Sequence, residues 1–416
     1  MSSRGRARQR SGRGRSLVGE RYDVRAERIA HGGSVVARHE GVVVFVRHTI
    51  PGERVVVEVT EGREGDRFLR ADAVEVLEPS PDRVRPPCPY AGPGLCGGCD
   101  FQHVALPAQR ALKAAVVAEQ LDRLAGLSVD VVVEPVPGDR AGLDWRTRVQ
   151  WAVDPSGRPG LRKHRSHEVV PIDDCRIAHP DLPPPVAASA RVVEPSRVVE
   201  LVETILSSTG EQLRLVTHAD GTTRADGPET LHEHAAGRDW QVTRSGFWQV
   251  HPGAADMLVS AVLDGLRPRP GERALDLYAG VGLFSAPIAH AVGPTGDVLS
   301  VEGDVQAAAD AAANLSDLPY VEVRNLRVDR ALADLGPANL VVLDPPRTGA
   351  KRDVVGSIAA LGPRVVAYVA CDPAALARDV AYFAEHGYRL RSLRALDLFP
   401  RTHHVECVAV LAPRGG

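Results

Sequence analysis

The stretch Arg273-Ala-Leu-Asp-Leu-Tyr-Ala-Gly-Val-Gly-Leu-Phe-Ser285 decides how the second half of this 416-residue chain folds. Ala274, Leu275 and Leu277 among its first five residues predict a β-strand over 273–277. The Gly-Val-Gly turn that follows leads into a helical pattern, and glycines at such a place let the backbone approach a ligand at a helix N-terminus. The stretch therefore predicts a strand, a ligand-binding turn and a helix.

The same order of strand, turn and helix recurs to the end of the chain. Candidate strands lie at Arg273–Leu277, Asp297–Val301, Leu340–Leu343, Arg364–Ala370, Arg389–Leu396 and Val405–Leu411. Helical stretches separate most of these segments, and such alternation is typical of a doubly wound, mostly parallel sheet. We therefore expect a Rossmann-like α/β domain over residues 246–416.

Further domains are expected before this one, because 416 residues are too many for one ordinary core. Residues 17–80 alternate apolar and polar side chains between glycines, which predicts a compact antiparallel β-barrel of about five strands. Residues 81–245 combine a helical pattern at 107–126 with short strand-like segments. We therefore expect an α+β central domain in that range.

Charge is distributed unevenly along the chain. The net charge is −3, but residues 1–16 carry six arginines and no acidic residue, so the remainder carries −9 (−3 − 6). This segment predicts a disordered tail that attracts nucleic acid; a general bias toward arginine is the alternative. No apolar run is long enough to span a bilayer, and the N-terminus lacks the hydrophobic core of a secretory signal. We expect a cytoplasmic monomer.

The glycine turn has an acidic partner on the next predicted strand. Glu302 ends that strand 22 residues after Gly280 (302 − 280), near the ~20-residue spacing at which a carboxylate binds ribose hydroxyls. The third glycine of a dinucleotide fingerprint is absent, since Ser285 stands in its place. Asp276, Gly280, Gly282 and Glu302 therefore indicate a site for S-adenosylmethionine rather than a nicotinamide dinucleotide. A tight turn without a ligand is the alternative.

Polar residues follow two other apolar strands directly. The run 340–343 leads into Asp344, and the run 365–370 leads into Cys371. Ligands of open α/β sheets bind outside the carboxyl ends of the strands, so both side chains should face the cofactor crevice. If the last strand runs antiparallel, as in class I methyltransferases, it starts at the same edge, and Glu406 is then expected near Cys371.

A thiol and a carboxylate beside a methyl donor suit methylation of uracil carbon 5, which is a poor nucleophile. Addition of the Cys371 thiolate to carbon 6 makes an enolate, and carbon 5 then accepts the methyl group. Glu406 would remove the carbon-5 proton so that the thiolate can leave. The base must be turned out of any stack to reach such a site. A core thiol at 371 and a solvated carboxylate at 406 are the alternatives.

Five motifs in a fixed order resemble those of the RNA (uracil-5-)methyltransferase family. They are Phe247-Trp-Gln-Val-His, Asp276-Leu-Tyr-Ala-Gly-Val-Gly, Asp344-Pro-Pro-Arg-Thr-Gly, Tyr368-Val-Ala-Cys-Asp-Pro and Phe399-Pro-Arg-Thr-His-His-Val-Glu. The resemblance covers about residues 20–412. It implies an OB-like TRAM barrel at 17–80, an iron–sulfur central domain at 81–245 and a class I methyltransferase domain at 246–416.

The resemblance also implies roles for single residues. Cys371 matches the family's nucleophile, and Glu406 matches its proton-abstracting base. The residues that match contacts to the methyl donor are Gln249, Tyr278, Glu302 and Asp344. The expected cofactor set is therefore these four together with Asp276, Gly280 and Gly282.

The chain departs from the family pattern at three positions. The family usually has Ser-Cys-Asn-Pro where this chain has Ala370-Cys-Asp-Pro, and it usually has Asn where this chain has His251. A negative charge at Asp372, next to the thiol, would oppose formation of a thiolate. Asp372 and His251 are the support for a rival interpretation, in which the protein is an RNA-binding scaffold without catalytic activity.

Three cysteines cluster in Cys88-x7-Cys96-x2-Cys99, and Cys175 is the candidate for a fourth ligand. Disulfides are not expected in a cytosolic protein, so the cluster indicates a metal site. Four thiolates suit either a 4Fe–4S cluster or structural zinc, and spacing alone does not separate them. The resemblance favours 4Fe–4S, although the family's first interval is usually shorter.

RNA is the expected partner of this chain. The barrel, the tail and a basic group in the central domain could follow phosphates; the group consists of Arg146, Arg148, Arg162, Lys163 and Arg165. By analogy, a TRAM barrel with a cluster favours ribosomal RNA over transfer RNA. An amino-group methyltransferase acting on nucleic acid is the rival enzyme, since it shares the sheet and needs no thiol.

Overall fold

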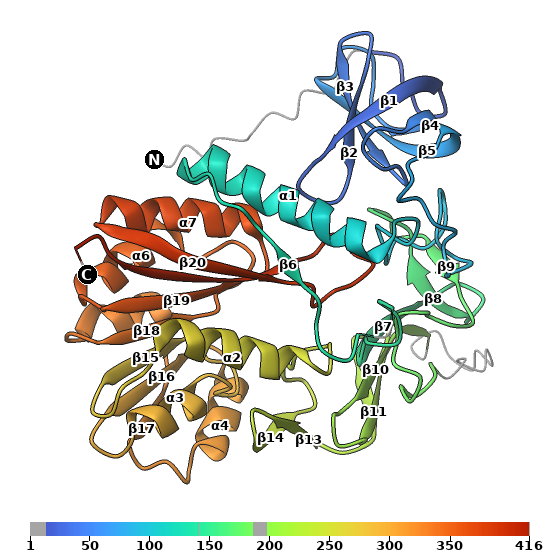
Figure 1. Ribbon diagram of the computed structural model, residues 1–416. Coiled ribbons are helices and arrows are strands. Elements are labelled where there is room, and N and C mark those ends of the chain that lie inside the picture. The colour runs from blue at the N-terminus through green and yellow to red at the C-terminus, as the bar shows by residue number, and fades with distance from the viewer. Residues whose placement is uncertain (1–13, 140, 186–197, 416) are drawn as a thin grey trace, which may run out of the picture. The chain divides into compact units, whose positions relative to one another are not determined.

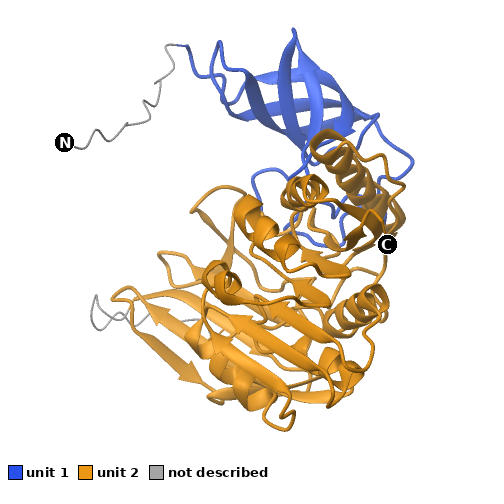
Figure 2. Ribbon diagram, turned by 90° about the vertical axis from the view of Figure 1, so that its left-hand side faces the viewer, with its two compact units in different colours: residues 1–95, 100–105 blue, residues 96–99, 106–416 orange. Residues whose placement is uncertain are grey.

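The computed structural model describes residues 14–139, 141–185 and 198–415. The predicted tail at 1–16 lies outside these residues except for its last three. The chain divides into two compact units, the first formed by residues 1–95 and 100–105 and the second by residues 96–99 and 106–416 (Figure 2). The expected domain boundaries at 80 and 245 stay predictions. Among the described helices, none is long and apolar enough to cross a membrane.

The first unit is built on a closed five-stranded barrel. Its strands are β1 (Arg21–Ile29), β2 (Val35–His39), β3 (Val42–Arg47), β4 (Arg54–Glu61) and β5 (Phe68–Glu78), in the order β1-β2-β3-β5-β4. Alternate valines and alanines fill the interior, as the period of two requires. The barrel confirms the prediction, with one correction: β3 and β5 are parallel, because β4 pairs between β5 and β1.

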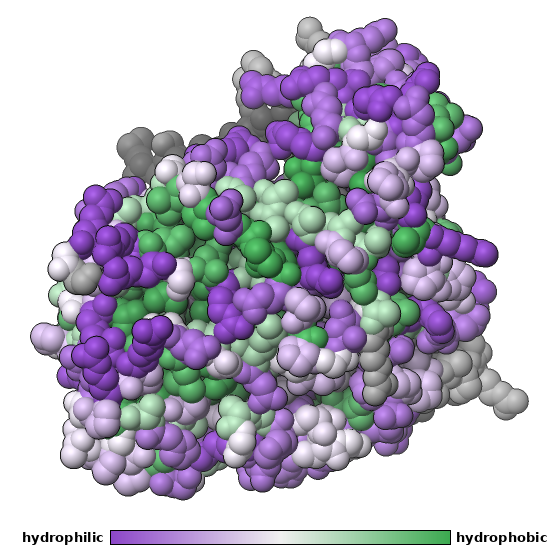
Figure 3. Space-filling model, in the orientation of Figure 1, coloured by the Kyte–Doolittle hydropathy of each residue, from purple (hydrophilic) through white to green (hydrophobic). Residues whose placement is uncertain are grey.

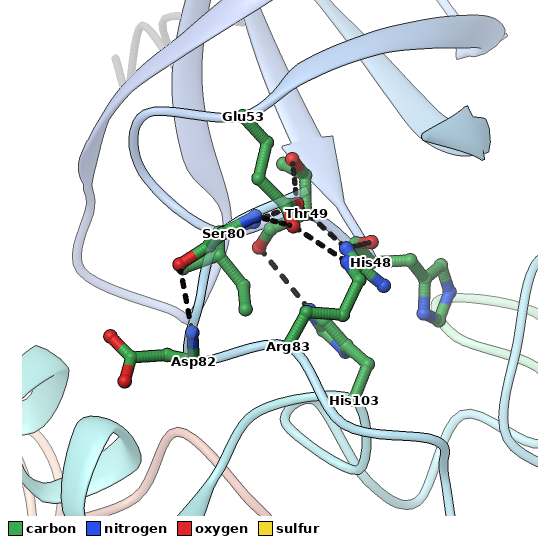
Figure 4. Close-up of polar contacts among 8 residues, drawn as sticks. His48, Thr49, Glu53, Ser80, Asp82, Arg83 and His103 are labelled. Atoms are coloured by element: carbon green, nitrogen blue, oxygen red, sulfur yellow. Dashed lines mark hydrogen bonds and ion pairs between the residues drawn. The ribbon is translucent and has the colours of Figure 1, made fainter. Parts of the chain in front are cut away.

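A buried carboxylate ties the barrel to the segment that follows it (Figure 4). Glu53, just before β4, is 1% exposed and accepts hydrogen bonds from Arg83 at 2.6 and 2.7 Å and from the Ser80 N–H at 3.0 Å. Burial alone would raise the pKa of Glu53, but these bonds outweigh it and lower the pKa. Nearby, His103 Nε2 lies 3.2 Å from the Thr49 carbonyl. The network closes the base of the loop that carries the first three cysteines, since Arg83 also pairs with Val104.

The second unit begins with a helix and a small antiparallel sheet. The helix α1 spans Leu106–Ala125, close to the predicted 107–126. The sheet contains β7 (Arg148–Val153), β8 (Pro159–Arg162), β9 (Val169–Pro171), β10 (Val199–Leu206), β11 (Gln212–His218) and β12 (Thr223–Asp226), in the order β12-β11-β10-β7-β8-β9. A separate hairpin follows, formed by β13 (Thr230–Ala235) and β14 (Arg238–Thr243).

An eight-stranded sheet forms the centre of the second unit. Its strands are β6 (Val133–Glu134), β15 (Arg273–Leu277), β16 (Asp297–Glu302), β17 (Val321–Asn325), β18 (Leu340–Leu343), β19 (Val365–Ala370), β20 (Tyr388–Leu396) and β21 (Glu406–Pro413). The order is β17-β16-β15-β18-β19-β21-β20-β6. Strands β15 to β19 are parallel, and β21 is antiparallel to both of its neighbours. The doubly wound sheet and its antiparallel last strand are therefore as predicted.

Helices cover both faces of this sheet (Figure 1). They are α2 (Ala254–Leu266), α3 (Ser285–Val292), α4 (Val305–Asn314), α5 (Val328–Ala331), α6 (Lys351–Ala360) and α7 (Pro373–Glu385), with a 3₁₀ turn at Leu332–Asp334. The helices α2, α3 and α4 pack into one core, and α1, α5, α6 and α7 pack into the other. The strands between them, such as the fully buried β18, are unbroken apolar runs because both faces are covered.

The sheet has two strands that the sequence patterns did not reveal. β17 is an edge strand whose residues are half-buried or exposed, so it lacks a continuous apolar run. β6 has only two residues and pairs in parallel with β20. Apolar side chains gather on the surface over α1 and β20 (Figure 3). Leu124 near the end of α1 is 40% exposed, and Val132 directly before β6 is 76% exposed. This end of the sheet therefore presents apolar side chains to solvent.

Candidate active site

The glycine turn between β15 and α3 has the backbone that its sequence predicts. Gly280 has φ 55° and Gly282 has φ 92°, both in the left-handed region, and Tyr278 is also there with φ 61°. A Cβ at Gly282 would lie 2.9 Å from Leu315 Cδ1, so another residue would strain the backbone and also displace that side chain. The backbone of this turn therefore has a conformation that favours glycine at 280 and 282.

Glu302, at the end of β16, braces this turn. Its carboxylate accepts hydrogen bonds from the Gly280 N–H at 2.9 Å and from the Asp304 N–H at 2.7 Å. A cavity of about 440 Å³ adjoins it and is lined by Tyr278, Glu302, Arg327, Asp329, Pro346 and Lys351, among others. Its volume lies within the range of about 300–1,000 Å³ that is typical of small-molecule sites. The cavity is the candidate site for the donor nucleoside.

Asp276 supplies a buried carboxylate next to the turn. It is 1% exposed; Oδ2 accepts the Ser285 hydroxyl at 2.6 Å, while Oδ1 has no hydrogen-bond partner among the described residues. Burial raises the pKa of Asp276 to about 7, against the hydrogen bonds from Ser285. A buried oxygen without a partner fits a ligand group that completes its bonding. The residues around the glycine turn therefore fit S-adenosylmethionine.

Asp344 lies beside Asp276 on the neighbouring strand end. β15 and β18 are parallel with Leu277 opposite Leu343, and the Asp344 N–H donates to the Leu277 carbonyl at 3.2 Å. Burial and the Asp276 carboxylate both raise the pKa of Asp344. Two acidic groups thus lie side by side at the carboxyl edge of the sheet.

The predicted nucleophile and base meet at this same edge. Cys371 is the first residue after β19, and Glu406 is the first residue of β21. The antiparallel register pairs Ala370 with Cys407, so Cys371 and Glu406 are opposite each other one step further. The Cys371 side chain is half-buried, and Glu406 is 6% exposed. The structure therefore brings together the two residues that the sequence proposed as a catalytic pair.

The surroundings of the pair disfavour negative charge. Burial, then Glu406, then Asp344 raise the pKa of the Cys371 thiol to about 11, and Arg347 opposes them. Burial, followed by Asp344, raises the pKa of Glu406 well above its usual range, and Arg347 again opposes the rise. A carboxylate whose pKa is raised binds an abstracted proton more firmly than an ordinary glutamate does. The arrangement therefore suits Glu406 as a base.

Asp372 has a structural partner that limits its effect on the thiol. It is the N-cap of α7, and its Oδ1 accepts the Ala375 N–H at 2.8 Å. Its charge thus lies at the positive end of a helix. Among the groups that raise the pKa of Cys371, Asp372 contributes least. The expected opposition to thiolate formation is present, but burial and Glu406 exceed it.

Three side chains around the candidate site were given no role from the sequence. Arg347 was quoted within a motif but given no role, although its charge faces both Cys371 and Glu406. Asp379 on α7 is 2% exposed and accepts hydrogen bonds from the Ala350 N–H and the Tyr368 hydroxyl, each at 2.6 Å. These bonds hold the loop that starts at Asp344. Tyr368 was quoted within a motif but given no role, and Asp379 lies in no motif, because only the fold brings the two side chains to that loop.

Gln249 lies in a different cavity from the other predicted donor contacts. This second cavity, of about 480 Å³, is lined by Gln249, Trp248, Glu233, His234, Ser207 and Thr147, among others. The neighbouring His251 is 4% exposed and its ring stacks on Trp145 at 5.8 Å. Burial lowers the pKa of His251, so the neutral ring is favoured and acts as a packing residue.

The predicted metal ligands do not form a preformed site. Over residues 14–139, 141–185 and 198–415, no three His, Cys, Asp or Glu side chains are grouped closely enough to hold a metal ion. Cys88 belongs to the first unit, whereas Cys96, Cys99 and Cys175 belong to the second. Cys175 is buried, and the other three are half-buried. The arrangement of these side chains therefore does not by itself fit a four-cysteine cluster.

Part of the basic group in the central domain is engaged within the protein. Arg148 donates to Glu203 at 2.8 Å and to the Gly246 carbonyl at 2.6 Å, and Lys163 forms an ion pair with Glu168 at 2.5 Å. These partners offset the positive charge that was expected to follow phosphates.

Known proteins resemble the chain in both units. A family model described as TRAM domain matches residues 15–74, and one described as tRNA (Uracil-5-)-methyltransferase matches residues 320–414. An uncharacterized RNA methyltransferase of Streptomyces coelicolor is 50% identical, over 96% of this chain and 94% of that protein. The 23S rRNA (uracil(1939)-C(5))-methyltransferase RlmD of Alkalilimnicola ehrlichii is 32% identical, over 96% of this chain and 98% of that one.

A solved structure shares the fold. The Pyrococcus abyssi tRNA (uracil-54, C5)-methyltransferase, in complex with S-adenosyl-L-homocysteine, superposes with a TM-score of 0.69 and 23% identity, covering 94% of this chain and all of that one. At that identity the likeness concerns the fold alone. Together with the full-length relatives, the five motifs and the facing Cys371 and Glu406, it leads to one conclusion: the chain belongs to the TRAM-containing, S-adenosylmethionine-dependent RNA (uracil-5-)methyltransferase family.

Proposed function

We propose that the protein methylates carbon 5 of a uridine in 23S ribosomal RNA, with Cys371 as nucleophile and Glu406 as base. The observation that carries the proposal is the opposition of these two side chains across β19 and β21, at the sheet edge that also holds Asp344. The relatives named RlmD are, by their names, 23S rRNA methyltransferases, and they align along nearly the whole chain. This alignment supports ribosomal rather than transfer RNA as the substrate.

The proposed reaction uses the two side chains in sequence. The Cys371 thiolate adds to uracil carbon 6, and the carbon 5–carbon 6 π electrons move toward carbon 5 and oxygen 4. S-adenosylmethionine, when bound, supplies a methyl group that the activated carbon 5 can accept. The Glu406 carboxylate then removes the carbon-5 proton, the double bond re-forms and the carbon–sulfur bond breaks. The thiolate and a protonated Glu406 are left at the end.

Arg347 has a role in the first step. Its guanidinium lowers the pKa of the Cys371 thiol against burial and the nearby carboxylates. It is exposed, so it reaches the site from the solvent side. We propose that its charge stabilises the thiolate and the enolate oxygen that addition produces. Asp379 and Tyr368 support the step indirectly, because they hold the loop on which Asp344 and Arg347 lie.

The donor site is proposed to lie along the glycine turn. Glu302 and Tyr278 line the cavity of about 440 Å³. Asp276, Gly280 and Gly282 belong to the strand and turn next to them, and the Gly280 N–H donates to Glu302. In this proposal the Glu302 carboxylate exchanges its bond to the turn for ribose hydroxyls. Gln249 stays proposed as a donor contact on the resemblance alone, since it lines the other cavity.

We also propose that Cys88, Cys96, Cys99 and Cys175 bind a 4Fe–4S cluster with a structural role. The sequence pattern and the family support this, whereas the arrangement of the described side chains does not. Protein purified without oxygen should be brown and contain about four iron and four sulfide per chain. Colourless protein that contains zinc would refute the cluster.

Nucleoside mass spectrometry tests the substrate. 23S rRNA and tRNA are separated from a strain lacking the gene and from the same strain carrying either the wild-type gene or the Cys371→Ala variant. We expect 5-methyluridine to decrease in the 23S rRNA of the first strain, to return with the wild-type gene and to stay low with the variant. A decrease confined to tRNA would overturn the choice of RNA, and restoration by the variant would overturn the role of Cys371.

A further inference from the structure

The helix α1 buries an unusual stripe of side chains. Its buried residues are Gln109, Lys113, Val116, Val117, Gln120 and Leu121, which share one face at helical spacing. The first two are 0% and 1% exposed. Lysine is almost never fully buried unless it is paired, because removing its charge from water is costly. The polar start of the stripe therefore calls for a specific partner.

That partner is the loop that joins β20 to β21, residues 397–405. Lys113 Nζ donates to Asp397 Oδ1 at 2.5 Å and to the Phe399 carbonyl at 3.0 Å. The side chains of Lys113 and Asp397 are both fully buried. The Asp397 N–H also donates to the Glu134 carbonyl on β6 at 2.8 Å. The start of the loop is thus held by elements that lie far before it in the chain.

A second contact holds the middle of the loop. Gln109 Oε1 accepts the Arg401 N–H at 2.9 Å, and Arg401 Nη2 donates to the Ala141 carbonyl at 2.8 Å. Arg401 has φ 68°, a left-handed conformation that a non-glycine residue adopts at some cost. The hydrogen bond from its backbone to Gln109 helps to hold that conformation. The helix therefore contacts the loop at residues 397, 399 and 401.

The same loop ends at Glu406. Within it, the Thr402 hydroxyl donates to the Phe399 carbonyl at 2.8 Å, and the His404 N–H donates to the Thr402 hydroxyl at 3.3 Å. These hydrogen bonds connect Phe399, which Lys113 contacts, to the residues that lead into β21. A buried ion pair is weak evidence for stability, since an apolar pair of similar volume often stabilises as well. The position in which the ion pair holds the 397–405 loop is therefore more informative about function than its contribution to stability.

We propose that Gln109 and Lys113 are positioning residues, which fix the 397–405 loop and thereby hold Glu406 against Cys371 for the elimination step. This inference rests on the proposed roles of Cys371 and Glu406. Neither positioning residue touches the reacting atoms. A loop that shifts by about 1 Å would leave the addition step intact, because Cys371 is on another strand, and would slow proton removal.

Two variants test the inference without leaving a charge unpaired. Gln109→Leu removes the contact to Arg401, and the double variant Lys113→Met with Asp397→Leu replaces the buried ion pair by apolar side chains of similar volume. The matched control is Gln120→Leu, which replaces another buried glutamine on the same stripe, about three turns further along α1. Thermal unfolding of all three variants shows whether they fold.

The substrate for this test is total RNA from a strain lacking the gene, with S-adenosylmethionine labelled in its methyl group. Turnover, the KM for RNA and the labelled protein–RNA adduct on a denaturing gel are measured together. We expect both test variants to lose roughly tenfold or more in kcat, to keep their KM and to accumulate labelled adduct, while Gln120→Leu behaves as the wild type. Unchanged kcat, or parallel loss of adduct and turnover, would overturn the inference.

The Glu406→Gln variant distinguishes failure of the positioning role from failure of the proposed roles of Cys371 and Glu406. If Glu406→Gln accumulates adduct and the α1 variants do not, the positioning role is wrong and the proposed reaction stands. If Glu406→Gln forms no adduct while its turnover is lost, the assignment of the base is wrong, and the positioning role is rejected with it.

Discussion

Cys371 and Glu406 occupy facing positions where β19 ends and β21 begins, one step beyond the pair formed by Ala370 and Cys407. After burial, the Glu406 carboxylate is the strongest influence that raises the pKa of the Cys371 thiol. The proposed base thus opposes ionisation of the proposed nucleophile in the free protein. In the proposed reaction this opposition ends once the thiol has added to uracil, and the same proximity would bring the carboxylate to the proton that must leave.

The pH profile of kcat/KM should report this opposition. The pKa of the Cys371 thiol in the free protein is raised to about 11, so the thiolate is a minor species at pH 7 and grows as pH rises. Deprotonation of Glu406, whose pKa is also raised, supplies the base for elimination as pH rises, while its charge opposes the thiolate. We expect kcat/KM to rise by up to roughly tenfold per pH unit between about pH 6 and 9. A plateau already reached at pH 7 would contradict the raised thiol pKa.

Arg347→Gln should shift that profile. The substitution removes the positive charge that lowers the pKa of Cys371, so the thiolate becomes scarcer at any given pH. We expect kcat/KM at pH 7.5 to fall by about tenfold or more, since one unit of pKa corresponds to tenfold. The loss should shrink toward high pH, and Arg347→Lys should retain part of the activity. An equal loss at every pH would instead indicate a contact to RNA.

Asp276→Asn should stabilise the fold at alkaline pH. The pKa of Asp276 is about 7 in the folded protein and near 3.8 when unfolded, so the folded state binds more protons between these values and loses stability as pH rises through them. The variant avoids this loss and can still accept the Ser285 hydroxyl. We expect its free energy of unfolding to exceed that of the wild type by on the order of 3 kcal/mol at pH 8, with no difference below pH 4. Equal stability at pH 8 would refute the raised pKa.

Much of the fold could be predicted from short sequence patterns. Buried parallel strands such as Leu340–Leu343 are unbroken apolar runs, so their limits are visible in the sequence. The two-residue strand β6 and the half-exposed β17 lack such a signal, because tertiary pairing rather than composition defines them. The parallel pairing of β3 with β5 was missed for a related reason, since strand order depends on where β4 inserts.

The residues of the candidate site likewise include some that the sequence could predict and some that it could not. Cys371, Asp344 and Glu406 were predictable because strand ends meet at one edge of an open sheet. Lys113 and Asp379 were not, because their partners are remote in the chain or absent from any motif. The effect of Asp372 was overstated from sequence, since the charge next to the thiol serves as a helix cap. Proximity in sequence is thus a poor guide to which charged groups shift the pKa of the Cys371 thiol most.

The proposed covalent role of Cys371 also distinguishes this enzyme from an amino-group methyltransferase. Such an enzyme needs no thiol, so Cys371→Ala would retain its turnover. We expect instead that Cys371→Ala abolishes both turnover and adduct, whereas binding of S-adenosylmethionine, measured by calorimetry, is preserved because the glycine turn is untouched. Retained methylation would favour the amino-group chemistry, and failure of the wild type to bind the donor would favour a scaffold.

The most direct measurement is the fate of Glu406→Gln on a denaturing gel. The variant is incubated with S-adenosylmethionine labelled in its methyl group and total RNA from a strain lacking the gene, with Cys371→Ala as the control. We predict a labelled protein–RNA band for Glu406→Gln, because addition and methylation proceed and elimination stops, and no such band for Cys371→Ala. Lost turnover without a band in Glu406→Gln, or a band in Cys371→Ala, would contradict the proposed roles of the two residues.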